Sequence, residues 1–268
     1  MSSPTRLGRG LSSDLFRSRF KVFCFLAFLS FSPLLASAQR NTERPPPLDP
    51  VQAEREARQL VTEMLSQRPA KDATNTGVLK IRDANDEQHE VAVRFDSFNT
   101  PTNWVSVYET LRGAPHSKLT VLHAERTNEY FLLSNGGDST SPKVLNEKQI
   151  MAPFAGSDFW VADLGLEFLH WPNQRLLKKE MRRNRFCWVL ESSTPHPVAG
   201  GYARVVSWIT QEAPHGIVHA DAYNEEGDVI KRFDPTEFKK VEGQWQLEGM
   251  EIRSSKSGSK TLIEFHLK

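Results

Sequence analysis

Few residues of this chain have the type and spacing to do chemistry, and the histidines come first. His215 and His219 form the one close histidine pair of interest. On a strand, residues four apart lie on one face but about 13 Å apart, too far to share one metal ion. A helix would bring the two rings together, but Gly216-Ile217-Val218 favours a strand. The pair therefore predicts no metal site, and Asp221 on the same face adds little.

No other spacing indicates a catalytic centre. Residues 136–141 are rich in Gly and Ser but lack the spacing and the lysine of a phosphate-binding loop, so we predict an exposed loop there. The sequence contains neither a G-x-S-x-G nucleophile elbow nor an H-E-x-x-H zinc motif. Glu225-Glu226 lies in a predicted turn, where two solvated carboxylates are ordinary. We therefore predict that the protein is not an enzyme and has no catalytic residue, metal or cofactor.

A basic run stands out between residues 175 and 185, where the one acidic residue is Glu180. Its cations are Arg175, Lys178, Lys179, Arg182, Arg183 and Arg185. Such a run forms either the solvated faces and turn of a hairpin or a patch for anionic lipid or an acidic partner. The whole chain holds 34 Lys and Arg against 33 Asp and Glu. This balance argues against nucleic-acid binding, which needs a clear basic excess.

Residues 1–38 have the layout of a secretory signal peptide. A basic region precedes an apolar run from Val22 to Leu35, and Ala36-Ser37-Ala38 is an A-x-A cleavage site. The run of about 14 residues is shorter than the about 20 that a transmembrane helix needs, and an uncleaved anchor is the alternative. Cys24 lies inside the run and not after it, so it does not read as a lipidated cysteine. Residues 39–49 follow as a Pro-rich linker, and residues 50–268 as one domain.

One amphipathic helix is predicted over residues 51–67. Asp49 suits its N-cap, Pro50 its first turn, and Pro69 its end. Its apolar residues recur at helical spacing on one face. They are Ala53, Ala57, Leu60, Val61, Met64 and Leu65.

Short strand-like runs fill the rest of the chain, spaced for antiparallel hairpins and not for β-α-β crossovers. They cover 77–82, 90–95, 104–111, 118–124, 129–134, 175–181, 185–190, 202–209, 216–223, 229–233, 238–241, 244–250 and 260–267. An insert at 149–169 interrupts them, with a short helix predicted over 158–169 and capped by Ser157 or Asp158. This helix is apolar nearly all round, so it is buried or covers an apolar surface. Cys187 has no partner after export, and its apolar neighbours predict that it is buried.

The insert carries a motif that resembles a known family. Residues 154–159 read F-A-G-S-D-F, followed by Asp163-Leu164. They resemble the F-x-G-S-D-F … D-L core of outer membrane lipoprotein-sorting proteins, the LolA-like superfamily that includes LolB and RseB. Four further pieces follow in the family's order. They lie at residues 187–191, 202–209 and 227–231, and at 243–245 together with 260–262, which resemble the family's last hairpin. One departure is Trp160-Val161-Ala162, where the commonest version has S-Y-E.

The resemblance implies a mainly β fold with helices (α+β), an incomplete and strongly curved antiparallel barrel whose open apolar side is covered by helices. It also implies a periplasmic protein that holds acyl chains of lipids or lipoproteins, as a lipoprotein-sorting carrier. Its expected partners are acyl chains and membrane-bound donor and acceptor proteins, with the carrier itself a monomer. The alternative is a non-catalytic sensor or protein-interaction module on the same fold.

A carrier needs an apolar space beneath its cover, and the large apolar residues of the predicted elements are the candidates. We expect the helix and the insert to border that space, and three tryptophans of the strands to form its floor. The candidate lipid-binding residues are Leu60, Met64, Phe159 and Trp160 on the border and Trp104, Trp188 and Trp208 on the floor. The alternative is that no such space exists and these side chains pack against one another in a filled core.

The first prediction concerns export. Cleavage after Ala38 should leave a mature chain that begins at Gln39, because signal peptidase recognises the A-x-A site at the end of the apolar run. N-terminal sequencing of the exported protein tests this. A full-length chain retained in the membrane would contradict the signal-peptide interpretation.

Overall fold

The computed structural model describes residues 48–111, 114–134, 141–241 and 244–267. All of them belong to one compact unit, Pro45–Lys268. The predicted signal peptide, most of the predicted linker and nearly all of the loop at 136–141 lie outside the described residues. No helix of the described part is long and apolar enough to cross a membrane.

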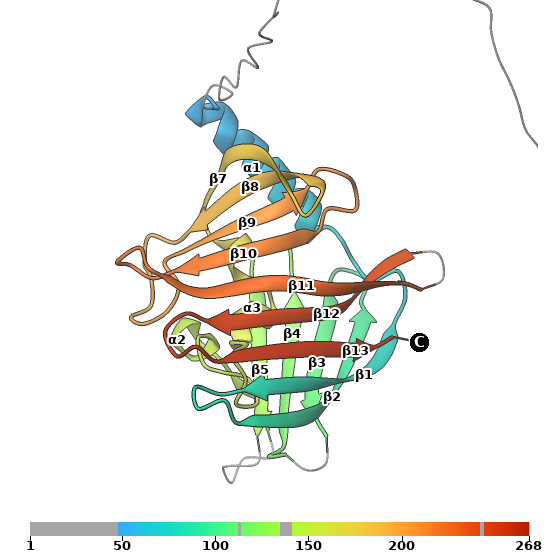
Figure 1. The fold of residues 1–268 in the computed structure, drawn as a ribbon. Helices are drawn as coiled ribbons and strands as arrows, with labels where there is room; N and C mark the ends of the chain where they lie inside the picture. The colour runs from blue at the N-terminus through green and yellow to red at the C-terminus, as the bar shows by residue number, and fades with distance from the viewer. Residues whose placement is uncertain (1–47, 112–113, 135–140, 242–243, 268) are drawn as a thin grey trace, which may run out of the picture. The chain divides into compact units, whose positions relative to one another are not determined.

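The described chain forms one antiparallel sheet of 13 strands, in the order β6-β5-β4-β3-β2-β1-β13-β12-β11-β10-β9-β8-β7. The sheet is open, with β6 and β7 as its edge strands. Each strand between these two edges pairs with two neighbours. The strands are β1 (Ala73–Arg82), β2 (Gln88–Asn99), β3 (Trp104–Thr110), β4 (Ser117–His123), β5 (Asn128–Ser134), β6 (Lys143–Val144), β7 (Asn173–Arg182), β8 (Arg185–Ser193), β9 (Arg204–Thr210), β10 (Ile217–Tyr223), β11 (Val229–Val241), β12 (Gln244–Ser254) and β13 (Lys260–His266). Figure 1 shows the strands in colours that follow the chain.

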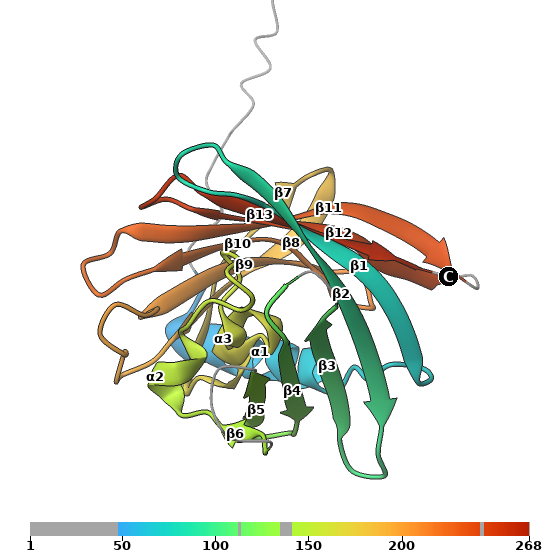
Figure 2. The same cartoon turned by 90° about the horizontal axis from the view of Figure 1, so that it is seen from below.

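The sheet is bent, and the helices lie on its inner side (Figure 2). The mainly β, antiparallel architecture predicted from the sequence is therefore present, as an open sheet with few helices. The helices are α1 (Pro50–Leu65), α2 (Glu147–Ile150), α3 (Val161–Leu164) and the 3₁₀ helix η1 (Glu167–His170). Three of these four helices have only four residues each, so the cover of helices that the resemblance implied is not confirmed.

The strand prediction needs one main correction. The runs 229–233 and 238–241 are parts of the one strand β11, which continues through Pro235. The pairing of β11 with β12 shifts register between Pro235 and Phe238. A proline has no N–H for the ladder, and a bulge is one of the places where a sheet tolerates it. The two-residue strand β6 and the short helix α2 were not predicted.

The helix predicted over 51–67 is α1, within two residues at its end. The Asp49 carboxylate accepts a hydrogen bond from the Gln52 backbone N–H at 3.0 Å, which caps the helix as expected. Ala57 is wholly buried and Leu60 is 6% exposed, on the apolar face that packs into the core. This face places α1 against β7.

The insert differs from its prediction. The single helix expected over 158–169 is two short pieces, because Leu166 between α3 and η1 has a φ of 49°. Gly165 contacts the Tyr130 ring so closely that a Cβ there would overlap it. Ser157 does not cap the helix, since its hydroxyl donates to the Phe154 carbonyl at 2.7 Å. The helix begins instead at Trp160, whose N–H donates to the Asp163 carboxylate at 2.7 Å.

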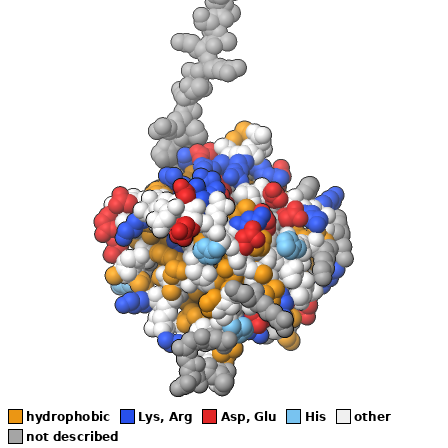
Figure 3. Space-filling view, turned by 60° about the horizontal axis from the view of Figure 1, so that its bottom comes forward, with side chains coloured by type: hydrophobic (Ala, Val, Ile, Leu, Met, Phe, Trp, Pro, Cys, Tyr) orange, Lys and Arg blue, Asp and Glu red, His pale blue; other side chains and the backbone are white. Residues whose placement is uncertain are grey.

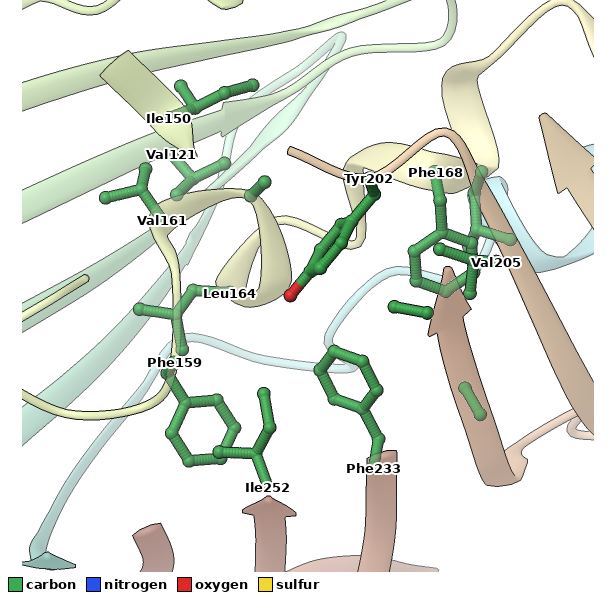
Figure 4. Close-up of a cluster of buried hydrophobic side chains, with 14 of the residues drawn as sticks. Val121, Ile150, Phe159, Val161, Leu164, Phe168, Tyr202, Val205, Phe233 and Ile252 are labelled. Carbon is green, nitrogen blue, oxygen red and sulfur yellow. The ribbon is translucent and has the colours of Figure 1, made fainter. Parts of the chain in front are cut away.

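The main core lies between the inner face of the sheet and the insert. Leu79, Ile263 and Ile252 are almost wholly buried and come from the three neighbouring strands β1, β13 and β12. Figure 4 shows Phe159 of the insert beside Ile252, with Phe233 and Leu164 close by. These contacts belong to one continuous cluster of buried apolar side chains.

A second, smaller cluster lies on the outer face of β8, β9 and β10. Its buried members are Cys187, Val189, Val206, Trp208 and Val218. Cys187 is wholly buried and is the one free cysteine of the described residues, as the sequence predicted. Burial raises the pKa of its thiol, and a protonated thiol is a poor nucleophile.

The second prediction follows from that environment. A thiol reagent should modify Cys187 slowly in the folded protein and rapidly in urea, because the native thiol is buried and protonated. Mass spectrometry of the peptide that contains Cys187 measures both rates. Rapid labelling without denaturant would show that the outer cluster opens readily.

Candidate functional site

Polar side chains attach the insert to the inner face of the sheet at its first turn. The Asp158 N–H donates to the Thr261 hydroxyl at 2.9 Å, and this hydroxyl donates back to the Asp158 carboxylate at 2.9 Å. The Ser259 hydroxyl donates to the same carboxylate at 2.5 Å. This attachment places the insert over β13.

A buried charged network attaches the insert to β11. The Lys231 Nζ donates to the Asp158 carbonyl at 2.5 Å and lies 3.4 Å from an Asp163 carboxylate oxygen. The side chains of Lys231 and Asp163 are 5% and 2% exposed. The Tyr202 hydroxyl donates to the other Asp163 oxygen at 2.9 Å. The Trp160 ring stacks on Tyr202, and the Lys231 Nζ lies 3.7 Å from the Trp160 ring centroid.

The pKa shifts of this network follow from its burial. Burial lowers the pKa of Lys231 to about 8, against the attraction of Asp163. Burial raises the pKa of Asp163, although Lys231 and two hydrogen bonds oppose it. Burial and the Asp163 charge raise the pKa of Tyr202 well above its ordinary value. At neutral pH, Lys231 is therefore a cation held by the insert, and Tyr202 is a neutral donor.

The far end of the insert is attached to β3 and β5. The Tyr130 hydroxyl donates to the Glu167 carboxylate at 2.8 Å, and the Asn128 amide donates to the Gly165 carbonyl at 2.8 Å. The Tyr108 hydroxyl donates to the Leu164 carbonyl at 3.0 Å. Strands from both halves of the sheet thus hold the insert, which fixes its place on the inner face.

A cavity of about 240 Å³ lies at one end of the sheet, beside β2, β3, β12 and β13. Its apolar lining comes mainly from Phe95, Trp104, Tyr108, Phe265 and Leu267. The Phe95 ring packs against Phe265 with centroids 4.6 Å apart and against Tyr108 at 5.4 Å. Small-molecule sites usually measure about 300–1,000 Å³, so this cavity is small for a whole lipid.

Polar groups also reach this cavity. Ser97, Ser106 and Asp96 contribute to its lining. Arg94 forms an ion pair with Asp96 at 3.0 Å, which satisfies that carboxylate. The Ser106 hydroxyl lies 2.8 Å from His123 Nε2, and burial lowers the pKa of His123 to about 4. His123 is therefore neutral at pH 7, and the cavity presents no titrating histidine at that pH.

A second cavity, of about 340 Å³, is polar. It lies between α1 and the start of β7, where Glu54, Arg58, Gln174, Arg175 and Glu191 contribute to its lining. Arg175 forms an ion pair with Glu191 at 2.6 Å. Its charged lining makes it a poor site for an acyl chain.

The structure brings together five of the seven predicted lipid-binding residues. Leu60 and Phe159 are buried in the main cluster, with Met64, Trp160 and Trp188 packed against it. Phe159 is wholly buried, so its side chain is part of the packed core in this conformation.

The other two predicted residues lie elsewhere. Trp104 lines the aromatic cavity and stacks on His123, with ring centroids 3.7 Å apart. Trp208 belongs to the outer cluster, and its indole N–H donates to Glu180. Trp188 pairs with Ile209 and Val189 with Trp208, so Trp208 is one residue out of register with the inner face.

Sequence reasoning missed most of the aromatic cavity. Phe265 and Leu267, which line the cavity, belong to the predicted strand-like run 260–267. Phe95 and Tyr108 are directly paired across β2 and β3. Nothing in the sequence indicated that pairing before the register was known.

His215 and His219, the close histidine pair of the sequence, contact different carboxylates. His215 Nε2 lies 3.1 Å from Glu63 of α1. His219 lies between Asp234 at 2.9 Å and Asp221 at 3.1 Å. Burial lowers the pKa of His219, but the bonds to these two carboxylates outweigh it and raise that pKa. Within the described ranges, no three His, Cys, Asp or Glu side chains come together as metal ligands would.

Comparisons with known proteins identify the fold. It is shared with solved structures that include a LolA superfamily protein and a lipoprotein-sorting domain, the kind of protein that the sequence motifs resemble. A family model described as "Uncharacterized protein"-like matches residues 119–267, more than half of the chain, and the chain belongs to that family. Among curated proteins, no sequence matches it.

Three solved structures share the fold at low sequence identity. A putative outer membrane lipoprotein-sorting protein domain from Vibrio parahaemolyticus has a TM-score of 0.66 and 16% identity, over 80% of this chain and 92% of that one. A DUF1329 family protein from Desulfovibrio piger has a TM-score of 0.65 and 17% identity, over 80% and 91%. A LolA superfamily protein from Nitrosomonas europaea has a TM-score of 0.56 and 15% identity, over 79% and 91%.

The third prediction concerns the buried network. Lys231→Met should lower the free energy of unfolding by about 3–5 kcal/mol, because it leaves the buried Asp163 carboxylate without its cation. Adding Asp163→Asn should recover part of this loss, since the neutral amide needs no cation. Urea unfolding measures both variants, with Lys256→Met at an exposed turn as the control. Purely additive losses in the double variant would contradict the charge pairing.

Proposed function

We propose that the protein is exported to the periplasm and binds acyl chains of lipids or lipoproteins at the inner face of its sheet. The observation that carries this proposal is the aromatic cavity at the end of that face, beside a core that the insert covers. A curved sheet with an apolar inner face suits an acyl chain, which gains about 0.8 kcal/mol for each buried methylene. Binding of this kind needs no catalytic group.

The cavity must widen to hold a long chain. Phe95 belongs to the main core, Phe265 packs against that core, and both also line the cavity. These two rings therefore separate the cavity from the apolar core beneath the insert. Displacing them would join the two spaces, and rings held by packing alone can move without breaking an ion pair.

The surface around the insert is also apolar. Figure 3 shows hydrophobic side chains gathered across the middle of the face seen there. Leu166 of the insert is 40% exposed and Val144 of β6 is 63% exposed. An acyl chain or a membrane-bound donor or acceptor protein would meet apolar groups on this face before it reached the core.

A second candidate function is a non-catalytic sensor or protein-interaction module. The packed inner core favours it, because Leu60 and Phe159 are buried in the main cluster and Trp188 packs against that cluster. On this interpretation the motif residues keep the fold rigid, and a protein partner binds at the surface. The two candidates differ in whether the inner face takes up lipid.

The fourth prediction distinguishes the two candidate functions. Ser97 lines the cavity and shares the inner face of β2 with Phe95, so Ser97→Trp should fill the cavity. On the lipid-binding proposal, the affinity for a fluorescent fatty acid should fall at least about tenfold, while stability changes by less than the about 1–3 kcal/mol that overpacking a filled core costs. Fluorescence titration and urea unfolding measure the two effects.

Two matched variants serve as controls. Ser255→Trp places the same side chain in the exposed turn between β12 and β13 and should leave binding unchanged. Leu60→Trp should lose about 1–3 kcal/mol of stability, because the core around Leu60 is filled. If the wild-type protein binds no fatty acid and carries no lipid in native mass spectrometry, the second candidate replaces the first.

A further inference from the structure

The end of the β7–β8 hairpin exposes an apolar pair. Arg183 and Asn184 have φ values of 49° and 59° and form the two-residue turn, a conformation typical of tight hairpins. Two positions back, Met181 pairs directly with Phe186. Met181 is 58% exposed and Phe186 is 66% exposed. Directly paired residues point to the same face, so the two side chains form one exposed apolar surface.

Cations surround this pair on both faces of the hairpin. The Lys179 Nζ lies 4.0 Å from the Trp188 ring centroid, and the Arg182 guanidinium lies 4.3 Å from that of Trp208. Within the described residues, neither forms an ion pair with a carboxylate. Their long apolar stems can lie along a surface while the charged ends reach outward.

The carboxylates near the hairpin do not cancel its charge. Lys178 forms an ion pair with Glu180 at 2.5 Å, and Arg183 with Asp234 at 2.8 Å. Arg185 lies 4.0 Å from Glu212, and both side chains are more than half exposed. With Lys179 and Arg182 added, the cations of the hairpin end outnumber these neighbouring carboxylates, so it is basic as well as apolar.

We propose that the end of the β7–β8 hairpin docks on an anionic lipid bilayer. Met181 and Phe186 enter the boundary between headgroups and acyl chains, and Lys179, Arg182 and Arg185 contact the anionic headgroups. An exposed apolar pair ringed by cations matches a membrane interface, which is apolar inside and negative outside. An acidic protein would satisfy the cations but would leave Met181 and Phe186 without an apolar partner.

This proposal is independent of acyl-chain binding at the inner face, and it has a direct test. Co-sedimentation of the full chain with phosphatidylcholine vesicles, with and without phosphatidylglycerol, measures the partition coefficient. Met181→Ser with Phe186→Ser should lower partition into the anionic vesicles at least about tenfold. Lys179→Gln with Arg185→Gln should lower it about fivefold for each charge removed and should reduce the preference for phosphatidylglycerol accordingly.

Matched changes elsewhere serve as controls. Phe98→Ser removes an aromatic side chain that is 41% exposed on β2, and Lys148→Gln with Lys256→Gln removes two exposed cations. Both controls should partition like the wild type, and every variant carries the same N-terminal segment, so its contribution is shared. Equal partition of hairpin and control variants, or binding to poly-glutamate but not to vesicles, would overturn the proposal. Fatty-acid binding should persist in the hairpin variants, which separates this test from that of the inner face.

Discussion

The desolvation of Lys231 is the constraint on which the rest of the arrangement depends. Its ammonium points from β11 into an apolar core, where an unpaired charge would be very costly. The Asp163 carboxylate and the Asp158 carbonyl meet that need, and both belong to the insert. The insert must therefore cross the inner face at one place and in one orientation. The filled centre of the face and the cavity at its end both follow from that placement.

This network also explains what the sequence motifs encode. Asp158, Asp163, Tyr202 and Lys231 come from three separate pieces of the LolA-like pattern, and the structure joins them in one buried set of contacts. The departure at Trp160 belongs to the same set, because its ring stacks on Tyr202 beneath the Lys231 ammonium. The motif thus specifies how the insert is held. It carries information about the fold and says little about which ligand the inner face accepts.

The sequence predicted the elements better than their contacts. Caps and apolar spacing placed α1 within two residues, and alternation located nearly every strand, because both signals are local. Trp208 was assigned to the wrong face because a slip of one residue reverses every side chain, and only the pairing with Val189 fixes the register. The insert was expected as one helix because nothing local showed that Gly165 must fit against Tyr130.

The centre of the inner face and its cavity end are held together by different forces. This difference decides where a ligand would enter. At the centre, moving the insert would separate Lys231 from Asp163 in a low-dielectric environment, which costs several kcal/mol at once. At the cavity end, Phe95 and Phe265 are held by ring packing, which can be exchanged for contacts with a methylene chain one group at a time. On the proposal that the inner face binds acyl chains, an entering chain would therefore begin at the cavity and advance toward the insert. The buried ion pair would be the last contact to yield, so it sets how far such a chain can penetrate without unfolding the insert.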